Sequence, residues 1–364
     1  MRNRSEMTSA ETVKKRKTIK RPLAVLVTVV IAALLIIGIA VIVIDPFMHF
    51  HGPINGLQYS LLDERYENDG IARHYDYEAM ITGTSMTQNF KASQMEELWD
   101  VETVKTSFSG ASYHELTSHM ERSIGYNPDL RYILCSLDGS RLFTEWDWNS
   151  YPDIPEYLYD DSILNDVNYI WNKDVIVKAI NNINYTRAGN RTPDMDEYGA
   201  WYKWATFSEE TAMSAYVKQE FTRKTVLSED DIRMIEENIS NNYLRLAMEN
   251  PEVTFYFFLP PYSSLYWKNV NEKGELIRQT DGEKYAVSLL LTAPNIEVYG
   301  FEGLTDITTD LNNYQDTLHY GPWINEKILN DIHDGDNRLT PDNYEEYFEH
   351  LKEIYRESDG TSFS

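Results

Sequence analysis

The sequence predicts an α/β fold in three layers, with helices on both faces of a five-stranded parallel sheet. Five short apolar segments alternate with helical segments beyond residue 76, which is the order expected of a parallel sheet. The third apolar segment, Arg131–Leu137, is apolar almost throughout, as expected for a strand covered on both faces. A longer apolar run near the N-terminus precedes this pattern and predicts one transmembrane helix.

Each element follows from its apolar pattern and from the residues that end it. Pro260 and Pro261 stop the fourth strand, Ser228 begins a helix with a capping-box pattern, and Pro251 ends that helix near Met248. In the helix expected over residues 112–124, the spacing of Glu115, His119 and Arg122 suits a solvent-exposed face. The predicted strands are Tyr77–Ile81, Val101–Phe108, Arg131–Leu137, Val253–Leu259 and Ile296–Phe301, and the other helices cover about 93–98, 282–291, 323–332 and 342–355.

The apolar run Leu23–Ile44 is long enough to cross a bilayer, which takes roughly 20 residues. Basic residues precede it, and such flanks stay in the cytoplasm. The alternative is a cleaved signal peptide, but its apolar core would be about 7–15 residues long with a small-residue exit. We therefore expect a cytoplasmic basic tail over 1–22, a single uncleaved span over 23–44 with the rest of the chain outside the cell, a juxtamembrane stalk over 45–75 that packs on the domain, and an extracytoplasmic domain over 76–364 with an aromatic-rich insertion at about 139–227.

The composition narrows the possible partners and the cellular setting. The first 22 residues carry a charge of +6, so the remainder carries −31, six units below the whole-chain value of −25. A domain this acidic is a poor partner for nucleic acid or an anionic bilayer. Cys135 is the one cysteine of the chain, so no internal disulfide forms, and an outer domain without disulfides suits a bacterial surface.

Two separate segments supply the groups needed for acyl transfer through a serine ester. Ser85 follows the first strand in Gly83-Thr84-Ser85, and His319 follows the last strand with Asp316 three residues before it. The carboxyl ends of parallel strands lie at one edge of a sheet, so these side chains are expected to meet there as nucleophile, base and orienting acid. The alternatives are a serine that caps the helix expected after the first strand, and a surface loop holding an Asp–His pair.

With these motifs the chain resembles the SGNH (GDSL-like) hydrolases, over roughly residues 76–140 and 250–335. Its anchored arrangement is similar to the DltD and alginate-acetylation type of surface proteins. The segments Glu64–Gly70 and Tyr151–Lys173 resemble a Gram-positive family of anchored SGNH-like proteins. The resemblance implies a flavodoxin-like sheet, the triad Ser85, His319 and Asp316, and oxyanion donors at the Ser85 and Gly110 backbone N–H groups.

The chain departs from the family pattern at two positions. Thr84 replaces the Asp of Gly-Asp-Ser, and Asp138 follows the third strand where the family usually has an Asn that donates to the oxyanion. A carboxylate cannot donate, so Asp138 either opposes the developing charge, turns away, hydrogen-bonds the Ser85 loop or positions a cationic acceptor. The resemblance therefore implies either an esterase or O-acyltransferase acting on a cell-envelope glycopolymer, or a non-catalytic scaffold that binds glycan or a membrane-bound acyltransferase.

Other candidate sites are weaker. His49 and His51 supply two metal ligands, which are too few for a site, so packing beside the span is expected instead. We find no phosphate-binding glycine loop and no zinc-ligand spacing, and we expect no cofactor. The aromatic residues of the insertion form either a sugar-stacking platform or an ordinary core; its tryptophans are Trp146, Trp148, Trp171, Trp201 and Trp204.

Overall fold

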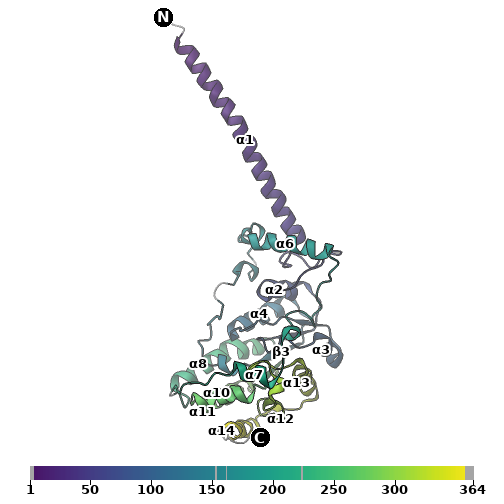
Figure 1. Ribbon diagram of the computed structural model, residues 1–364, viewed down its shortest axis with the longest axis vertical. Coiled ribbons are helices and arrows are strands. Elements are labelled where there is room, and N and C mark those ends of the chain that lie inside the picture. Colours follow the sequence, from purple (N-terminus) through teal and green to yellow (C-terminus); the bar gives the residue numbers. More distant parts are fainter. Residues whose placement is uncertain (1–3, 152–153, 161, 223, 357–364) are drawn as a thin grey trace. The chain divides into compact units, whose positions relative to one another are not determined.

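The structure, a computed structural model, describes residues 4–151, 154–160, 162–222 and 224–356 (Figure 1). The chain forms two compact units. The first comprises Met1–Tyr59 and Glu156–Arg191, and the second comprises Ser60–Pro155 and Thr192–Ser364. The segment expected to be one insertion, 139–227, is thus divided between the two units.

The first unit contains the helix α1 (Arg4–Ile44), α5 (Val167–Ile170) and α6 (Lys173–Arg187). Within α1, the segment Pro22–Ile44 is 23 residues long, and the mean hydropathy of its most apolar window is 3.3. At 1.5 Å per residue it is about 34 Å long, enough to cross the hydrocarbon core of a bilayer. The single N-terminal helix expected from the sequence is therefore present, and it is long and apolar enough to span a membrane.

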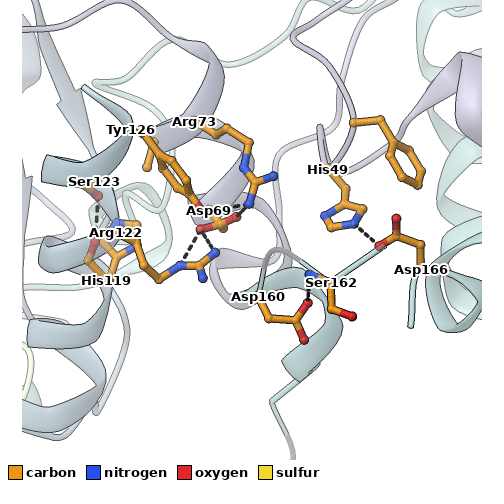
Figure 2. Close-up of polar contacts among 12 residues, drawn as sticks. His49, Asp69, Arg73, His119, Arg122, Ser123, Tyr126, Asp160, Ser162 and Asp166 are labelled. Carbon is orange, nitrogen blue, oxygen red and sulfur yellow. Dashed lines mark hydrogen bonds and ion pairs between the residues drawn. The ribbon is translucent and has the colours of Figure 1, made fainter. Parts of the chain in front are cut away.

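Asp45 turns the chain sharply where α1 ends. Its backbone is left-handed, with φ of 41°. Its carboxylate accepts hydrogen bonds from the backbone N–H groups of His49, Phe50 and His51, and from the Tyr169 hydroxyl at 2.6 Å. His49 Nε2 lies 2.9 Å from Asp166 Oδ1 (Figure 2), and His51 Nε2 lies 3.0 Å from the Ile42 carbonyl. Both histidines are thus part of the packing beside the apolar helix.

The second unit contains a six-stranded sheet in the order β2-β1-β3-β4-β5-β6. All five predicted strands are present and parallel, but the five-strand expectation is incomplete because β6 pairs antiparallel with β5 at the edge. The chain passes from β1 to β2 on one side and then crosses back to β3 on the other side of β1, so the topological switch point lies between β1 and β3. The strands are β1 (Ala79–Thr82), β2 (Thr103–Lys105), β3 (Tyr132–Ser136), β4 (Thr254–Leu259), β5 (Ile296–Gly300) and β6 (Arg338–Leu339).

Helices cover both faces of the sheet, as the three-layer prediction requires. On one face Phe258 belongs to a core cluster with Met95 of α3 (Ala92–Trp99) and Ile328 of α13 (Pro322–Asp334). Phe257, its neighbour along β4, points to the opposite face because side chains alternate along a strand. There it meets Tyr243 of the π-helical turn η4 (Ser240–Leu244), with ring centroids 4.6 Å apart.

The remaining helices of this unit complete the two layers. The helix expected from Ser228 to Met248 is interrupted by the π-helical turn η4, which separates α8 (Glu229–Ile239) from α9 (Arg245–Glu249). The other helices are α2 (Glu64–His74), α4 (Tyr113–Tyr126), α7 (Glu209–Ala215), α10 (Ser264–Glu272), α11 (Leu276–Leu290), α12 (Thr305–Thr308) and α14 (Tyr344–Arg356).

The predicted solvent face of α4 is wrong, because α2 packs on it. Glu115 and His119 are buried, and Glu115 pairs with Arg65 of α2 at 2.7 Å. Arg122 of α4 donates to Asp69 of α2, which also accepts from Arg73 (Figure 2). Burial lowers the pKa of His119 to about 3, so its ring stays neutral while Nε2 bonds the Thr106 hydroxyl at 3.0 Å.

Candidate active site

Ser85 lies in a turn at the carboxyl end of β1. The alternative in which Ser85 caps the next helix is wrong: residues 85–89 form turns, and α3 begins at Ala92. Gly83 permits this turn because its φ is +132°, and a Cβ there would lie 2.7 Å from Ser136 Oγ. The glycine therefore allows the Ser85 turn to pack directly on the end of β3, at the switch point of the sheet.

Ser85, His319 and Asp316 form one hydrogen-bonded chain. Ser85 Oγ lies 2.8 Å from His319 Nε2, although the two residues are 234 positions apart. His319 Nδ1 lies 2.7 Å from Asp316 Oδ2. Asp316 Oδ1 accepts from the backbone N–H groups of Leu318 and His319, each at 2.8 Å. The structure thus brings together the three side chains that the sequence singled out.

Electrostatics keep the acid of this chain in its charged form. Burial alone raises the pKa of Asp316, but the hydrogen bonds and charge of His319 outweigh it and lower that pKa below its usual value. A charged Asp316 accepts a hydrogen bond from the Nδ1–H group of His319, which leaves Nε2 as the acceptor for the Ser85 hydroxyl. This is the arrangement in which an imidazole acts as a general base on a serine.

Trp201 braces the triad from the aromatic-rich segment. Its Nε1 donates to the Ser85 carbonyl at 3.2 Å, and its ring meets the His319 ring edge-on, with centroids 5.3 Å apart. Asn89 Oδ1 accepts from the Trp201 backbone N–H at 3.1 Å. The sequence placed Trp201 among several candidate platform residues, and no pattern distinguished it from the others.

The Gly110 turn is held by charged side chains. Glu64 accepts from the Ser109 N–H at 2.6 Å, and Arg65 donates to the Ser109 carbonyl at 3.0 Å. Arg141 donates to the Gly110 carbonyl at 3.1 Å. Burial raises the pKa of Glu64 to about 7. Sequence analysis missed Glu64, Arg65 and Arg141, because their use depends on where α2 and the loop after β3 lie.

The turns after β1 and β2 each contain a backbone N–H group without a partner in the described part of the chain. Among the described residues, neither the Ser85 N–H nor the Gly110 N–H has a hydrogen-bond partner. The two turns are joined by a 2.8 Å bond from the Phe108 N–H to the Gly83 carbonyl. Arg65 acts on the peptide that carries the Gly110 N–H, because a cation on its carbonyl polarises the whole amide. Both groups are therefore suited to bind an oxyanion.

Asp138 is a buried acceptor of hydroxyl hydrogen bonds. Its Oδ2 accepts from Ser136 Oγ at 2.8 Å and Thr84 Oγ1 at 3.0 Å, and its Oδ1 accepts from the Tyr262 hydroxyl at 2.5 Å. Its carbonyl accepts from the Tyr113 hydroxyl at 2.9 Å. Of the roles considered from the sequence, the structure shows a bond to the Ser85 loop, made through Thr84.

No protein-family model, characterised protein or solved structure matches this chain. Within the described residues, no three His, Cys, Asp or Glu side chains are grouped so as to hold a metal ion. The site combines a serine, an imidazole, a carboxylate and two backbone N–H groups that have no partner among the described residues.

Proposed function

We propose that the protein is a membrane-anchored extracytoplasmic serine esterase or O-acyltransferase that acts on a cell-envelope glycopolymer. The observation that carries this proposal is the continuous chain Ser85–His319–Asp316, with contacts of 2.8 and 2.7 Å. Three residues from two ends of the sequence meet at the sheet edge where α/β enzymes bind ligands. The SGNH-like motifs quoted above support the same activity.

In the proposed reaction, Ser85 Oγ attacks the carbonyl carbon of an ester while His319 Nε2 takes the hydroxyl proton. The N–H groups of Ser85 and Gly110 bind the negative oxygen that forms. The tetrahedral intermediate then collapses and breaks the bond to the leaving oxygen, which receives the proton from His319. The acyl group remains on Ser85. Water or a sugar hydroxyl then attacks the acyl carbon, with His319 as base, and Ser85 recovers its proton.

A fluorophosphonate probe on the full-length protein in detergent tests the nucleophile. We expect labelling of the wild type and of Ser140→Ala, which removes an exposed serine after β3, and no labelling of Ser85→Ala. Asp316→Asn should slow labelling roughly 10³- to 10⁴-fold, because the imidazole loses the acceptor that fixes its tautomer. Labelling that persists in Ser85→Ala would show that another residue reacts.

The proposed location rests on the apolar helix and its flanks. The basic residues before Pro22 favour a cytoplasmic N-terminus, which places the domain outside the cell. Protease added to intact cells should then remove the domain beyond Asp45. Protection of the domain in intact cells, with digestion only after lysis, would reverse the orientation.

The alternative function is a non-catalytic scaffold that binds glycan or a membrane-bound acyltransferase. It is favoured by the third strand end, where Asp138 supplies an acceptor and no side-chain donor to an oxyanion. A wild-type protein that is folded but inert toward the phosphonate would favour this alternative.

A further inference from the structure

A pocket of about 320 Å³ lies on the second unit between α4 and the π-helical turn η4. α4 contributes His114 and Thr117, the loop after β3 contributes Trp146, and η4 contributes Asn241 and Asn242. None of these residues belongs to the triad. The pocket is therefore a separate feature whose lining combines an aromatic face, amides and a hydroxyl.

The lining suits a sugar ring. Trp146 is 38% exposed, and His114 meets its ring edge-on with centroids 5.8 Å apart, which leaves indole surface open to a ligand. Among the described residues, the buried Thr117 Oγ1 has no hydrogen-bond partner. A pyranose offers an apolar C–H face to an aromatic ring and hydroxyls to amides and alcohols, so it matches both parts of the lining.

The charge of the pocket favours a neutral ligand. Arg245, which also lines the pocket, is paired with the lining residue Glu121 at 2.9 Å and with Glu249 at 2.7 Å. Its positive charge is thus already balanced within the protein. An anionic ligand would also meet the −31 charge carried by the chain beyond residue 22.

The pocket wall is held in place by specific polar contacts. Asn242 Nδ2 donates to the Trp146 carbonyl at 3.0 Å and to Asn238 Oδ1 at 2.8 Å, and Asn238 donates to the Arg141 carbonyl at 3.1 Å. These bonds tie the Trp146 loop to the helix that contains η4. π-helical turns are rare, and many occur at functional sites.

The Trp146 loop leads from the pocket to the proposed oxyanion donor. Trp148 lies under Arg141, which donates to the Gly110 carbonyl. Arg65 Cζ lies 3.7 Å from the centroid of the Tyr151 ring. The Tyr151 hydroxyl lies 3.0 Å from the position that a Cβ on Gly110 would occupy. Tyr151 is five positions after Trp146 in the chain, so the two backbones are at most roughly 17 Å apart.

We propose that this pocket binds a neutral pyranose unit of the glycan whose ester reacts at Ser85. In this proposal Trp146 stacks on the pyranose ring. The exposed residues Trp148 and Tyr151 lie along the chain between Trp146 and the side chains that contact the Gly110 turn. The link to Ser85 rests on the proposed function, whereas the saccharide site itself does not. A polymer held at both places would present successive residues to the nucleophile.

Saccharide binding to the full-length protein tests the site. The protein is kept in a polyoxyethylene detergent, because glycoside detergents would themselves present sugar, and cellohexaose, maltohexaose and chitohexaose are titrated by calorimetry. We expect at least one to bind, and Trp146→Ala to weaken its binding about tenfold or more. Trp204→Ala removes a tryptophan that is 80% exposed and does not line the pocket, and should leave the binding constant unchanged.

Two further variants separate the possible failures. Asn241→Ala, an exposed lining residue, should also weaken binding while leaving the thermal midpoint unchanged, which excludes misfolding as the cause. Ser85→Ala should bind the hexaose as the wild type does, because it leaves the lining of the pocket intact. Two results would overturn the proposal even if Ser85 reacts. One is that none of the three hexaoses binds at concentrations up to about 10 mM, which would detect even a weak dissociation constant. The other is that Trp146→Ala leaves the binding constant unchanged.

Discussion

Replacing Asp138 with Asn distinguishes two physical roles for this carboxylate. If Asp138 opposed the oxyanion, the amide of Asn would remove a negative charge and supply a donor, and Ser85 would react faster. In the structure its two oxygens instead accept hydroxyl hydrogen bonds from Thr84, Ser136 and Tyr262. We therefore expect Asp138→Asn to slow the reaction of Ser85.

The size of the effect follows from the acceptors that are lost. The Asn amide keeps one oxygen, so either the Tyr262 bond or the Ser136 bond loses its acceptor, while Thr84 Oγ1 lies within reach of both positions. A hydrogen bond to a charged group contributes about 1.5–3 kcal/mol. The free energy of unfolding should fall by that amount. If all of it acted on the Ser85 turn, the reaction would slow about 10- to 100-fold.

Two measurements on the same samples give the answer. The rate of phosphonate labelling reports the reactivity of Ser85, and urea unfolding reports stability, with Asp147→Asn as a control in the loop after β3. Asp147 is exposed and makes none of these contacts. Labelling of Asp138→Asn at or above the wild-type rate would refute the positioning role and restore the oxyanion-opposing one.

Three further outcomes are expected. Arg65→Met should slow labelling about tenfold through loss of the charged bond to Ser109, whereas Arg73→Met on the same helix should leave it within about twofold. Burial raises the pKa of Glu283 to about 8, so the free energy of unfolding should fall as pH rises from 4.5 to 8. Glu283→Gln should make this fall less steep. An unchanged dependence of the unfolding free energy on pH in Glu283→Gln would contradict this prediction. Burial lowers the pKa of His119 to about 3, so the free energy of unfolding should drop as pH falls from 6.5 toward 3. The drop should be less steep in His119→Gln, which denaturant titrations at a series of pH values would measure.

The parts of the fold that the sequence predicts are those with strong apolar patterns. The five parallel strands are short apolar segments between helices, and all are present. β6 was missed because its two residues are too few for any periodicity. α2 was missed because it buries Glu67, Asn68 and Asp69, polar residues that a hydrophobic pattern assigns to the surface. Its partner face on α4 was then assigned to solvent for the same reason.

The site was predictable to the extent that strand ends determine position. Ser85 follows β1 and the Asp316–His319 pair follows β5, and the carboxyl ends of these parallel strands lie at one edge of the sheet. Trp201 comes from a segment without periodic pattern, and its contacts with Ser85 and His319 depend on packing. Arg65 was beyond prediction for a similar reason, since it reaches Ser109 from a helix that the sequence did not indicate.

Thr84 and Asp138 are chemically complementary. The residue before the nucleophile is Thr84, a hydroxyl donor, and the residue after the third strand is Asp138, a carboxylate that accepts from it at 3.0 Å. A carboxylate at both positions would place two like charges in one buried contact, and a neutral residue at both would leave the Ser136 and Tyr262 hydroxyls without their charged acceptor. A hydroxyl at position 84 and a carboxylate at position 138 therefore form a charged hydrogen bond between the turn that carries Ser85 and the end of the neighbouring strand. In the proposed reaction Asp138 supplies no side-chain donor to the oxyanion, so stabilisation rests on the two backbone N–H groups, and the Arg65 contact with Ser109 should matter to the rate.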